Sequence, residues 1–138
     1  MNELELARLI AAKFHAGQKY GEDDYTVHLD EVESMVRIMF PEEDRLPIIA
    51  QLHDILEDTH MTNSTLETLF DYDTVLAVND MTKNSMQTRA EYLLHCMTNQ
   101  LSRKCKMADA FCNLRRSLVR GDMKRVKRYG ETLALLAS

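Results

Sequence analysis

The scarcity of helix-breaking residues is the feature that most constrains the fold of this chain. Only four glycines and two prolines interrupt its 138 residues. Between them, apolar residues recur at intervals of three and four, the spacing of amphipathic helices, and no alternating strand pattern competes. The length suits one ordinary domain with a core of its own. We therefore predict an all-α fold in a single domain spanning residues 1–138.

The expected helix boundaries follow from glycine, proline and capping residues. Pro41 is expected to stop the second helix, and Pro47 is tolerated in the first turn of the third. The predicted helices run from Leu4 to about Gly17 or Gly21, from Thr26 to Met39, from Asp44 to Glu57, from Ser64 to Phe70, from Asp73 to Thr82, from Thr88 to Val119 with a break near Thr98 or Asn99, and onward from Gly121.

No segment has the character of a membrane span or a secretory signal. No apolar run approaches the roughly 18 residues that a spanning helix needs. The first residues, MNELELARLI, carry acids where a secretory signal carries bases. Cys96, Cys105 and Cys112 form no CxxC pair and are expected to be reduced thiols. We expect a cytoplasmic protein that does not contact a membrane.

Charge is distributed unevenly along the chain. Seventeen of the 22 acidic residues lie in residues 1–73, and ten of the 17 Lys and Arg residues lie between Arg103 and Arg128. The basic segment indicates either a surface for an anion or a solvated amphipathic face. Nucleic acid is not the expected partner, because the net charge is −5 and no aromatic platform accompanies the bases. A homo-oligomer is compatible with these features.

The segment HDILED, residues 53–58, places four ionisable side chains in an otherwise apolar helix. Residues four apart share a helix face, so His53 should lie near Glu57, and Asp54 near Asp58. Three carboxylates this close would repel one another in a low-dielectric groove unless a cation lies among them. The alternative is a polar helix edge that faces solvent. This helix alone leaves both explanations open.

Two further segments carry ligand-type residues. His28 lies in DDYTVHLDEV, at the head of the second predicted helix, and Asp109 lies in KCKMADAFCNL. Lys106 precedes Asp109 by about one turn, and Asn113 follows it by one turn. Taken singly, His28 could be a capping or core histidine and Asp109 a structural partner of Lys106. Taken together with the histidine and aspartate of HDILED, they form a recognisable order.

The order His28, His53-Asp54, Asp109 resembles that of the HD-domain metal-dependent phosphohydrolases. More narrowly, it is similar to the hydrolase domain of RelA/SpoT-type alarmone enzymes and their small single-domain relatives. The likeness covers nearly the whole chain, through the segments AAKFHAGQ, YTVHLDEV, AQLHDILEDTHMT, LETLF, MTK, TRAEYL and KMADAFCNL. The fold that it implies is a compact HD-domain helical bundle, in agreement with the helical pattern.

The resemblance also implies roles for individual residues. The implied ligands of one metal ion are His28, His53, Asp54 and Asp109. The ion is typically Mn²⁺ in the alarmone branch, and a site without cysteine suits a six-coordinate ion better than closed tetrahedral zinc; Mg²⁺, Fe²⁺ and Zn²⁺ are the alternatives. Glu57 and Asp58 would orient or deprotonate the attacking water and handle the leaving group's proton. The implied substrate contacts are Lys19, Lys83, Asn113 and Tyr129.

The chain departs from the family pattern at two places. Relatives carry two adjacent bases after the HxGQ turn, whereas this chain has Lys19-Tyr20 followed by GEDDY, and Ala110 stands where relatives often have a base. One phosphate-binding cation is therefore missing. The bases that might replace it lie in the basic segment: Arg103, Lys104, Arg115 and Arg116.

The expected function is that of a (p)ppGpp 3′-pyrophosphohydrolase, in which water attacks the 3′-diphosphate and pyrophosphate leaves. One alternative is an HD-family hydrolase of another nucleotide, such as a nucleoside monophosphate or a different signalling nucleotide. The other alternative is a non-catalytic module that binds a nucleotide or a protein.

Overall fold

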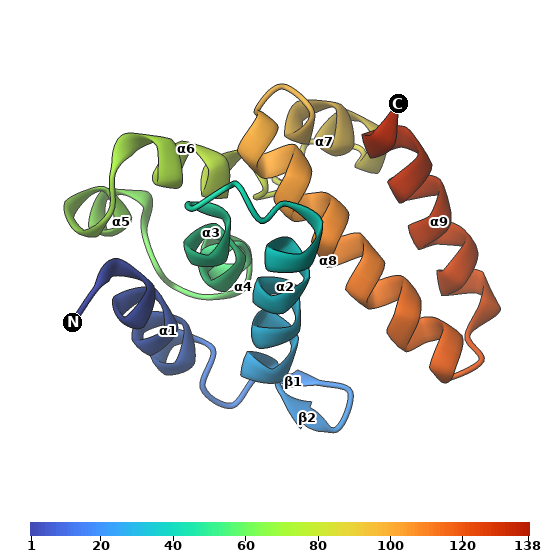
Figure 1. The fold of residues 1–138 in the computed structure, drawn as a ribbon, viewed down its shortest axis with the longest axis horizontal. Helices are drawn as coiled ribbons and strands as arrows, with labels where there is room; N and C mark the ends of the chain where they lie inside the picture. The colour runs from blue at the N-terminus through green and yellow to red at the C-terminus, as the bar shows by residue number, and fades with distance from the viewer.

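The computed structural model describes all 138 residues and contains nine helices and one short hairpin (Figure 1). The helices are α1 (Glu3–Phe14), α2 (Tyr25–Met39), α3 (Leu46–Leu52), α4 (Ile55–Asp58), α5 (Asn63–Leu69), α6 (Tyr72–Asp80), α7 (Arg89–Cys96), α8 (Gln100–Val119) and α9 (Met123–Ala137). The antiparallel strands are β1 (Lys19–Tyr20) and β2 (Asp23–Asp24). The predicted all-α class is confirmed.

The hydrophobic core surrounds α3, which Figure 1 shows among α1, α2, α6 and α8. Every residue of α3 is buried, as expected of a helix that is apolar on nearly all sides. Its polar member, Gln51, donates hydrogen bonds of 2.9 Å to both Asp30 and Glu33. Because α3 is enclosed in this way, the residues at its C-terminal end have a fixed position in the fold.

The prediction of one continuous helix from Asp44 to Glu57 is wrong. α3 ends at Leu52 with His53 as its C-cap, and α4 begins at Ile55. Asp54 between them has φ −106° and ψ 2°, in the sparsely allowed bridge region where active-site residues often lie. His53 contributes to the interruption, since its Nδ1 lies 2.7 Å from the carbonyl oxygen of Ala50. Hydrophobic spacing alone does not detect such a break.

The hairpin of β1 and β2 was not predicted, because each strand has only two residues. Gly21 at its turn has φ +63°, in the left-handed region that favours glycine. A Cβ atom there would lie 2.1 Å from Nη2 of Arg120, so any other residue at this turn would also displace the exposed Arg120 side chain. The hairpin is thereby packed against the C-terminal end of α8.

Side-chain caps define several of the other helix ends. Asn99 accepts hydrogen bonds from the backbone N–H groups of Leu101 and Ser102, which confirms the predicted break before α8. Thr62 caps α5, which begins at Asn63, one residue before the expected start at Ser64. A second apolar cluster of Tyr92, Leu93, Cys96 and Leu136 joins α7 to α9. None of the helices is both long enough and apolar enough to span a bilayer.

Candidate metal centre and its cleft

Three buried side chains from different elements meet between α2, the end of α3, and α8. They are His28, His53 and Asp109, and one ligand atom of each lies within 4.8 Å of the others. Nε2 of His28 is 2.9 Å from Oδ1 of Asp109. Residues separated by up to 81 positions in the chain are thus brought together. The three residues are part of the predicted metal-ligand set.

The hydrogen bonding of His53 leaves one ring nitrogen for a cation. Its Nδ1 is directed at the carbonyl oxygen of Ala50, so this nitrogen carries the proton and Nε2 is the acceptor in the neutral ring. Nε2 is buried and has no hydrogen-bond partner, yet it lies 3.0 Å from Oδ2 of Asp54 and 3.5 Å from Oδ1 of Asp109. An acceptor nitrogen facing two carboxylates requires a positive charge between them.

Asp54, the fourth predicted ligand, lies directly beside this group. Its Oδ2 accepts a hydrogen bond from the hydroxyl of Tyr25. Burial raises the pKa of Asp54, but the nearby His53 outweighs it and lowers the pKa to about 2. Burial lowers the pKa of His53, whereas Asp54 and Asp109 together raise it well above its usual value. Without a metal ion, a proton on His53 therefore supplies the positive charge that the carboxylates require.

Lys106 is the protein's own counter-charge at the floor of the site. Its Nζ lies 2.9 Å from Oδ2 of Asp109, and Nδ2 of Asn113 donates to Oδ1 of the same carboxylate at 3.2 Å. Burial acts to raise the pKa of Asp109, but Lys106 holds it well below the usual range. Asp109 is therefore ionised and oriented, as a metal ligand must be.

The donor set fits a divalent metal ion. It offers imidazole nitrogens and carboxylate oxygens without a thiolate, which suits an ion of the Mn²⁺ type and does not exclude Mg²⁺, Fe²⁺ or Zn²⁺. The Nε2 atom of His53 most directly indicates such an ion, because it has no hydrogen-bond partner and lies near carboxylate oxygens of Asp54 and Asp109.

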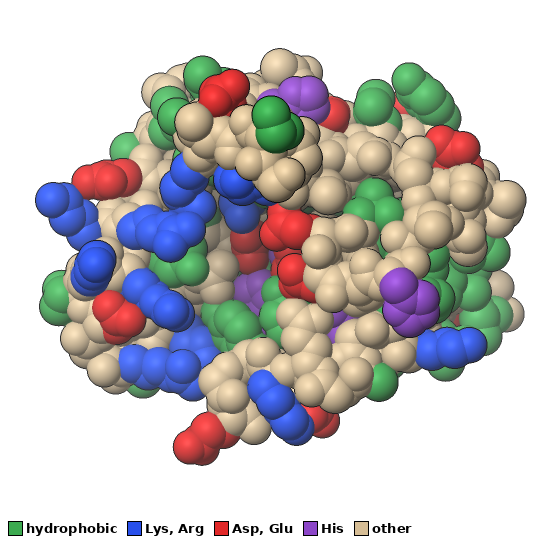
Figure 2. Space-filling view, turned by 180° about the vertical axis from the view of Figure 1, so that it is seen from behind, with side chains coloured by type: hydrophobic (Ala, Val, Ile, Leu, Met, Phe, Trp, Pro, Cys, Tyr) green, Lys and Arg blue, Asp and Glu red, His purple; other side chains and the backbone are tan.

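A cleft of about 300 Å³ opens above this group. Figure 2 shows a hollow whose floor carries Asp, Glu and His side chains, with many Lys and Arg side chains beside it. Three cations line the cleft at its rim: Lys83, Arg89 and Arg128. Four tyrosines also line it: Tyr20, Tyr25, Tyr92 and Tyr129. The cleft thus combines a site for a cation with a surface for an anion.

Glu57 and Asp58 both line this cleft, and each binds a different partner. Oε1 of Glu57 accepts the backbone N–H of Lys83 at 2.6 Å, and Oδ2 of Asp58 accepts from Nε2 of Gln18 at 3.1 Å. Both residues are exposed overall, yet partial burial of their carboxyl groups raises the pKa of each, reinforced for Asp58 by the charge of Asp54. Raised pKa values bring carboxyl groups closer to the range useful for proton transfer at neutral pH.

The two parallel rows of side chains expected on one straight helix do not form. His53 faces Asp54 and Asp109, while Glu57 and Asp58 bind the Lys83 backbone and Gln18. The interruption at Asp54 explains this difference, because it ends the regular spacing of four residues. The interruption directs the side chains of His53 and Asp54 toward each other, with Nε2 of His53 3.0 Å from Oδ2 of Asp54.

The predicted substrate contacts divide into two groups. Lys83, Asn113 and Tyr129 line the cleft. Lys19 does not, because its Nζ pairs with Asp24 at 2.6 Å and faces a neighbouring pocket of about 470 Å³. Tyr20 takes the place beside the metal group, where its ring stacks on His28 with centroids 4.4 Å apart and its hydroxyl donates to Asn113.

None of the four bases suggested as replacements for the missing cation lines this cleft. Arg103 donates to the Leu136 carbonyl, and Lys104 pairs with Glu43 at 2.7 Å. Arg115 and Arg116 face other pockets. The cations at the rim of the cleft are instead Lys83, Arg89 and Arg128.

Besides Lys106, five residues that line the cleft were given no role in the site by sequence reasoning: Tyr20, Tyr25, Arg89, Tyr92 and Arg128. Tyr25 was detectable, since it precedes His28 by three residues at the start of the same helix and therefore shares its face. Tyr20 was noted only as a departure from the family pattern. Arg89 lies in the segment TRAEYL and Arg128 ends the basic segment, but nothing in the sequence placed either beside the metal ligands, because α7 and α9 meet only in the folded chain.

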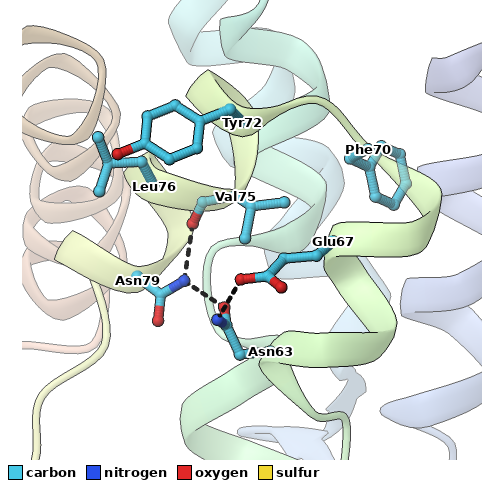
Figure 3. Close-up of a pocket in the computed structure, with 7 residues that line it drawn as sticks. All are labelled: Asn63, Glu67, Phe70, Tyr72, Val75, Leu76 and Asn79. Carbon is cyan, nitrogen blue, oxygen red and sulfur yellow. Dashed lines mark hydrogen bonds between the residues drawn. The ribbon is translucent and has the colours of Figure 1, made fainter.

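A larger pocket of about 580 Å³ lies between α5 and α6 (Figure 3). It offers no histidine and no group of metal-type ligands. Its polar side chains bind one another: Asn63 donates to Glu67 at 2.9 Å, and Asn79 donates to Asn63 and to the carbonyl of Val75. Volume alone does not mark a catalytic site, so the smaller cleft with the ionisable cluster is the candidate.

Comparison with known proteins bears on the fold. No family model and no curated protein matches the sequence. Among solved structures, the chain is similar to a metazoan ortholog of SpoT that hydrolyzes ppGpp and plays a role in starvation responses. The two share 20% sequence identity with a TM-score of 0.80, over 99% of this chain and 85% of the other. The chain therefore shares its fold with this SpoT ortholog, in agreement with the resemblance that its sequence motifs indicated.

Proposed function

We propose that this protein is a metal-dependent phosphohydrolase of a nucleotide, and specifically a (p)ppGpp 3′-pyrophosphohydrolase that uses Mn²⁺. The observation that carries the proposal is the acceptor nitrogen of His53 facing Asp54 and Asp109 at the floor of a cleft with a cationic rim. The fold shared with a ppGpp-hydrolysing SpoT ortholog supports the choice of substrate.

In this proposal the metal is held by His28, His53, Asp54 and Asp109. A bound divalent ion supplies Lewis-acid polarisation of a phosphoryl oxygen and makes water more acidic. Tyr25 and Lys106 orient the two carboxylates through their hydrogen bonds, and the Ala50 carbonyl fixes the tautomer of His53.

Glu57 and Asp58 are proposed to handle the protons of the reaction. Their raised pKa values and their position in the cleft suit one group to accept a proton from water and the other to donate to the leaving oxygen. Lys83, Asn113 and Tyr129 are proposed to contact the substrate. Lys19 is assigned a peripheral role, because it faces the neighbouring pocket.

A second candidate is hydrolysis of another nucleotide by the same chemistry. The observation that favours it is the wall beside the metal group, where Tyr20 presents a ring and Lys19 is neutralised by Asp24. Such a wall offers less charge to a diphosphate than two free bases would.

A nucleotide panel separates these proposals. Purified protein with Mn²⁺ is incubated with ppGpp, pppGpp, the adenine counterpart, nucleoside mono- and triphosphates and cyclic dinucleotides, and the products are identified by ion-exchange chromatography. Formation of GDP and pyrophosphate from ppGpp supports the first proposal, whereas inorganic phosphate from a monophosphate supports the second. Tight nucleotide binding without product under any metal would contradict both and indicate a binding module.

A further inference from the structure

Two arginines on the rim of the cleft come from separate helices and have no acidic partner. Arg89 is the first residue of α7, and Arg128 lies in α9. Both line the cleft that contains the metal-type group. Neither guanidinium lies within 4.0 Å of a carboxylate, whereas the neighbouring Arg116 and Arg125 each do. The two unpaired arginines therefore line the same cleft as the metal-type group.

The position of Arg89 is fixed by α9. Its Nη2 donates to the hydroxyl of Thr132 at 2.7 Å, and that hydroxyl in turn donates to the carbonyl of Arg128 at 3.1 Å. The remaining donors of the Arg89 guanidinium make no hydrogen bond to the protein and are available to a ligand. Arg128 is exposed, and its guanidinium carbon lies 5.9 Å from the ring centroid of Tyr129.

Holding these two cations near each other is unfavourable in the absence of an anion. Burial lowers the pKa of Arg89, and the charge of Arg128 lowers it further. The two guanidinium groups repel one another, and no carboxylate lies within ion-pair distance of either. A phosphate group would relieve this repulsion, since guanidinium donors match phosphate oxygens in pairs.

We propose that Arg89 and Arg128 form a phosphate-binding clamp that holds a phosphate group other than the one cleaved at the metal centre. Floor and clamp line the same cleft of about 300 Å³, so one small molecule can occupy both. The ligand class is a nucleotide phosphorylated at two separate positions. The inference rests on the proposed function and adds to it the residues that recognise the distal phosphate.

The kinetic test compares two substrates that differ only at the distal position. These are ppGpp and guanosine 3′-diphosphate, which lacks the 5′-phosphates. Arg128→Gln and Arg89→Gln should each raise KM for ppGpp by about tenfold to a hundredfold, with kcat little changed, because a charge-assisted contact is lost in ground and transition state alike. The same variants should leave hydrolysis of guanosine 3′-diphosphate nearly unchanged.

The matched control is Lys127→Gln, which removes an exposed cation from the same helix but outside the cleft. It should leave both substrates unaffected. Arg89→Lys tests whether any loss in Arg89→Gln comes from the bond to Thr132, since lysine retains the charge. Equal losses for both substrates, or an unchanged KM for ppGpp, would overturn the clamp.

A binding measurement tests the phosphate-binding clamp without relying on enzyme turnover. Inorganic pyrophosphate is titrated calorimetrically into wild-type, Arg89→Gln/Arg128→Gln and Lys127→Gln proteins in EDTA, so that no metal contributes. Wild type and the control should bind at least about tenfold more tightly than the double variant. No binding by wild type, or equal affinity in all three, overturns the clamp even if ppGpp is hydrolysed. Selective binding without ppGpp hydrolysis would instead retain the clamp and reject the proposed reaction.

Discussion

The floor and the rim of the cleft differ in burial, charge and partners. On the floor, His28, His53 and Asp109 are buried, and Asp109 is bound to Lys106 and Asn113. On the rim, Arg128 is exposed, and neither it nor Arg89 has an acidic partner. The floor carboxylates have Lys106 and, without a metal ion, protonated His53 as their counter-charges, whereas the two rim arginines have no acidic partner. This difference is what a site for a metal ion and a phosphorylated ligand requires.

The two regions also differ in how firmly the fold holds them. The floor lies at the end of the fully buried α3 and against α8 in the main core. The rim is built from long side chains at the start of α7 and on the outer helix α9. Substitutions on the floor should therefore change chemistry and stability together, whereas those on the rim should change binding alone.

The largest effect is expected from the floor. Asp54→Asn preserves shape and the bond to Tyr25, but it removes a charge that the metal needs. Loss of the ion forfeits several kcal/mol of transition-state stabilisation, so kcat/KM should fall on the order of a thousandfold or more. Metal content by mass spectrometry and ppGpp turnover measure the change. Asp73→Asn, an exposed aspartate on α6, is the control, and an Asp54→Asn protein with full metal and full activity would remove Asp54 from the site.

The next effect separates proton transfer from metal binding. Glu57→Gln and Asp58→Asn should retain the ion while kcat falls by about a hundredfold to ten-thousandfold, because only the proton-handling groups are lost. Rapid-quench turnover and metal analysis on the same samples test this. Glu67→Gln, in the α5–α6 pocket, is the matched control. If Glu67→Gln were impaired and the other two variants were not, the catalytic site would lie in the pocket between α5 and α6 and not in the cleft.

A smaller effect is expected where Tyr25 supports the floor. Tyr25→Phe removes the hydroxyl that binds Asp54 and leaves the ring that stacks on His15. Groups that orient metal ligands typically contribute about tenfold to a hundredfold in metal affinity. Titration of the apoprotein with Mn²⁺ measures this ratio. An affinity equal to that of wild type would mean that Tyr25 does not orient the carboxylate.

The smallest effect is a change in thermal stability with pH. In the folded, metal-free protein the pKa of His53 is raised above the value near 6.5 of an unfolded chain. The stabilisation by protonated His53 is thus fully present below about pH 6.5 and is lost as pH rises through the folded pKa. Bound Mn²⁺ replaces this charge, and at 100 times its Kd it adds about 2.7 kcal/mol.

The difference in melting temperature between Mn²⁺ and EDTA samples should therefore be larger at pH 8.5 than at pH 6. Differential scanning fluorimetry at both pH values measures it, and His95→Gln, an exposed histidine outside the cleft, serves as the control. A difference that stays the same at both pH values would show that no titrating group is exchanged for the metal.

The sequence predicted those features that depend on local spacing or on an ordered motif. Helical periodicity indicated the all-α class, and the order of His28, His53-Asp54 and Asp109 indicated residues that the fold brings together. It did not predict the break at Asp54 or the hairpin at Gly21, which depend on a few backbone angles. It also missed Arg89 and Arg128, because their proximity arises only from the packing of α7 against α9.

The most direct test of the central claim is anomalous diffraction from crystals soaked in Mn²⁺ and measured at the manganese absorption edge. We predict one strong anomalous peak on the cleft floor, among His28, His53, Asp54 and Asp109. The absence of a peak there, or a peak only at acidic residues outside the cleft, would contradict the assignment of this group as a metal centre.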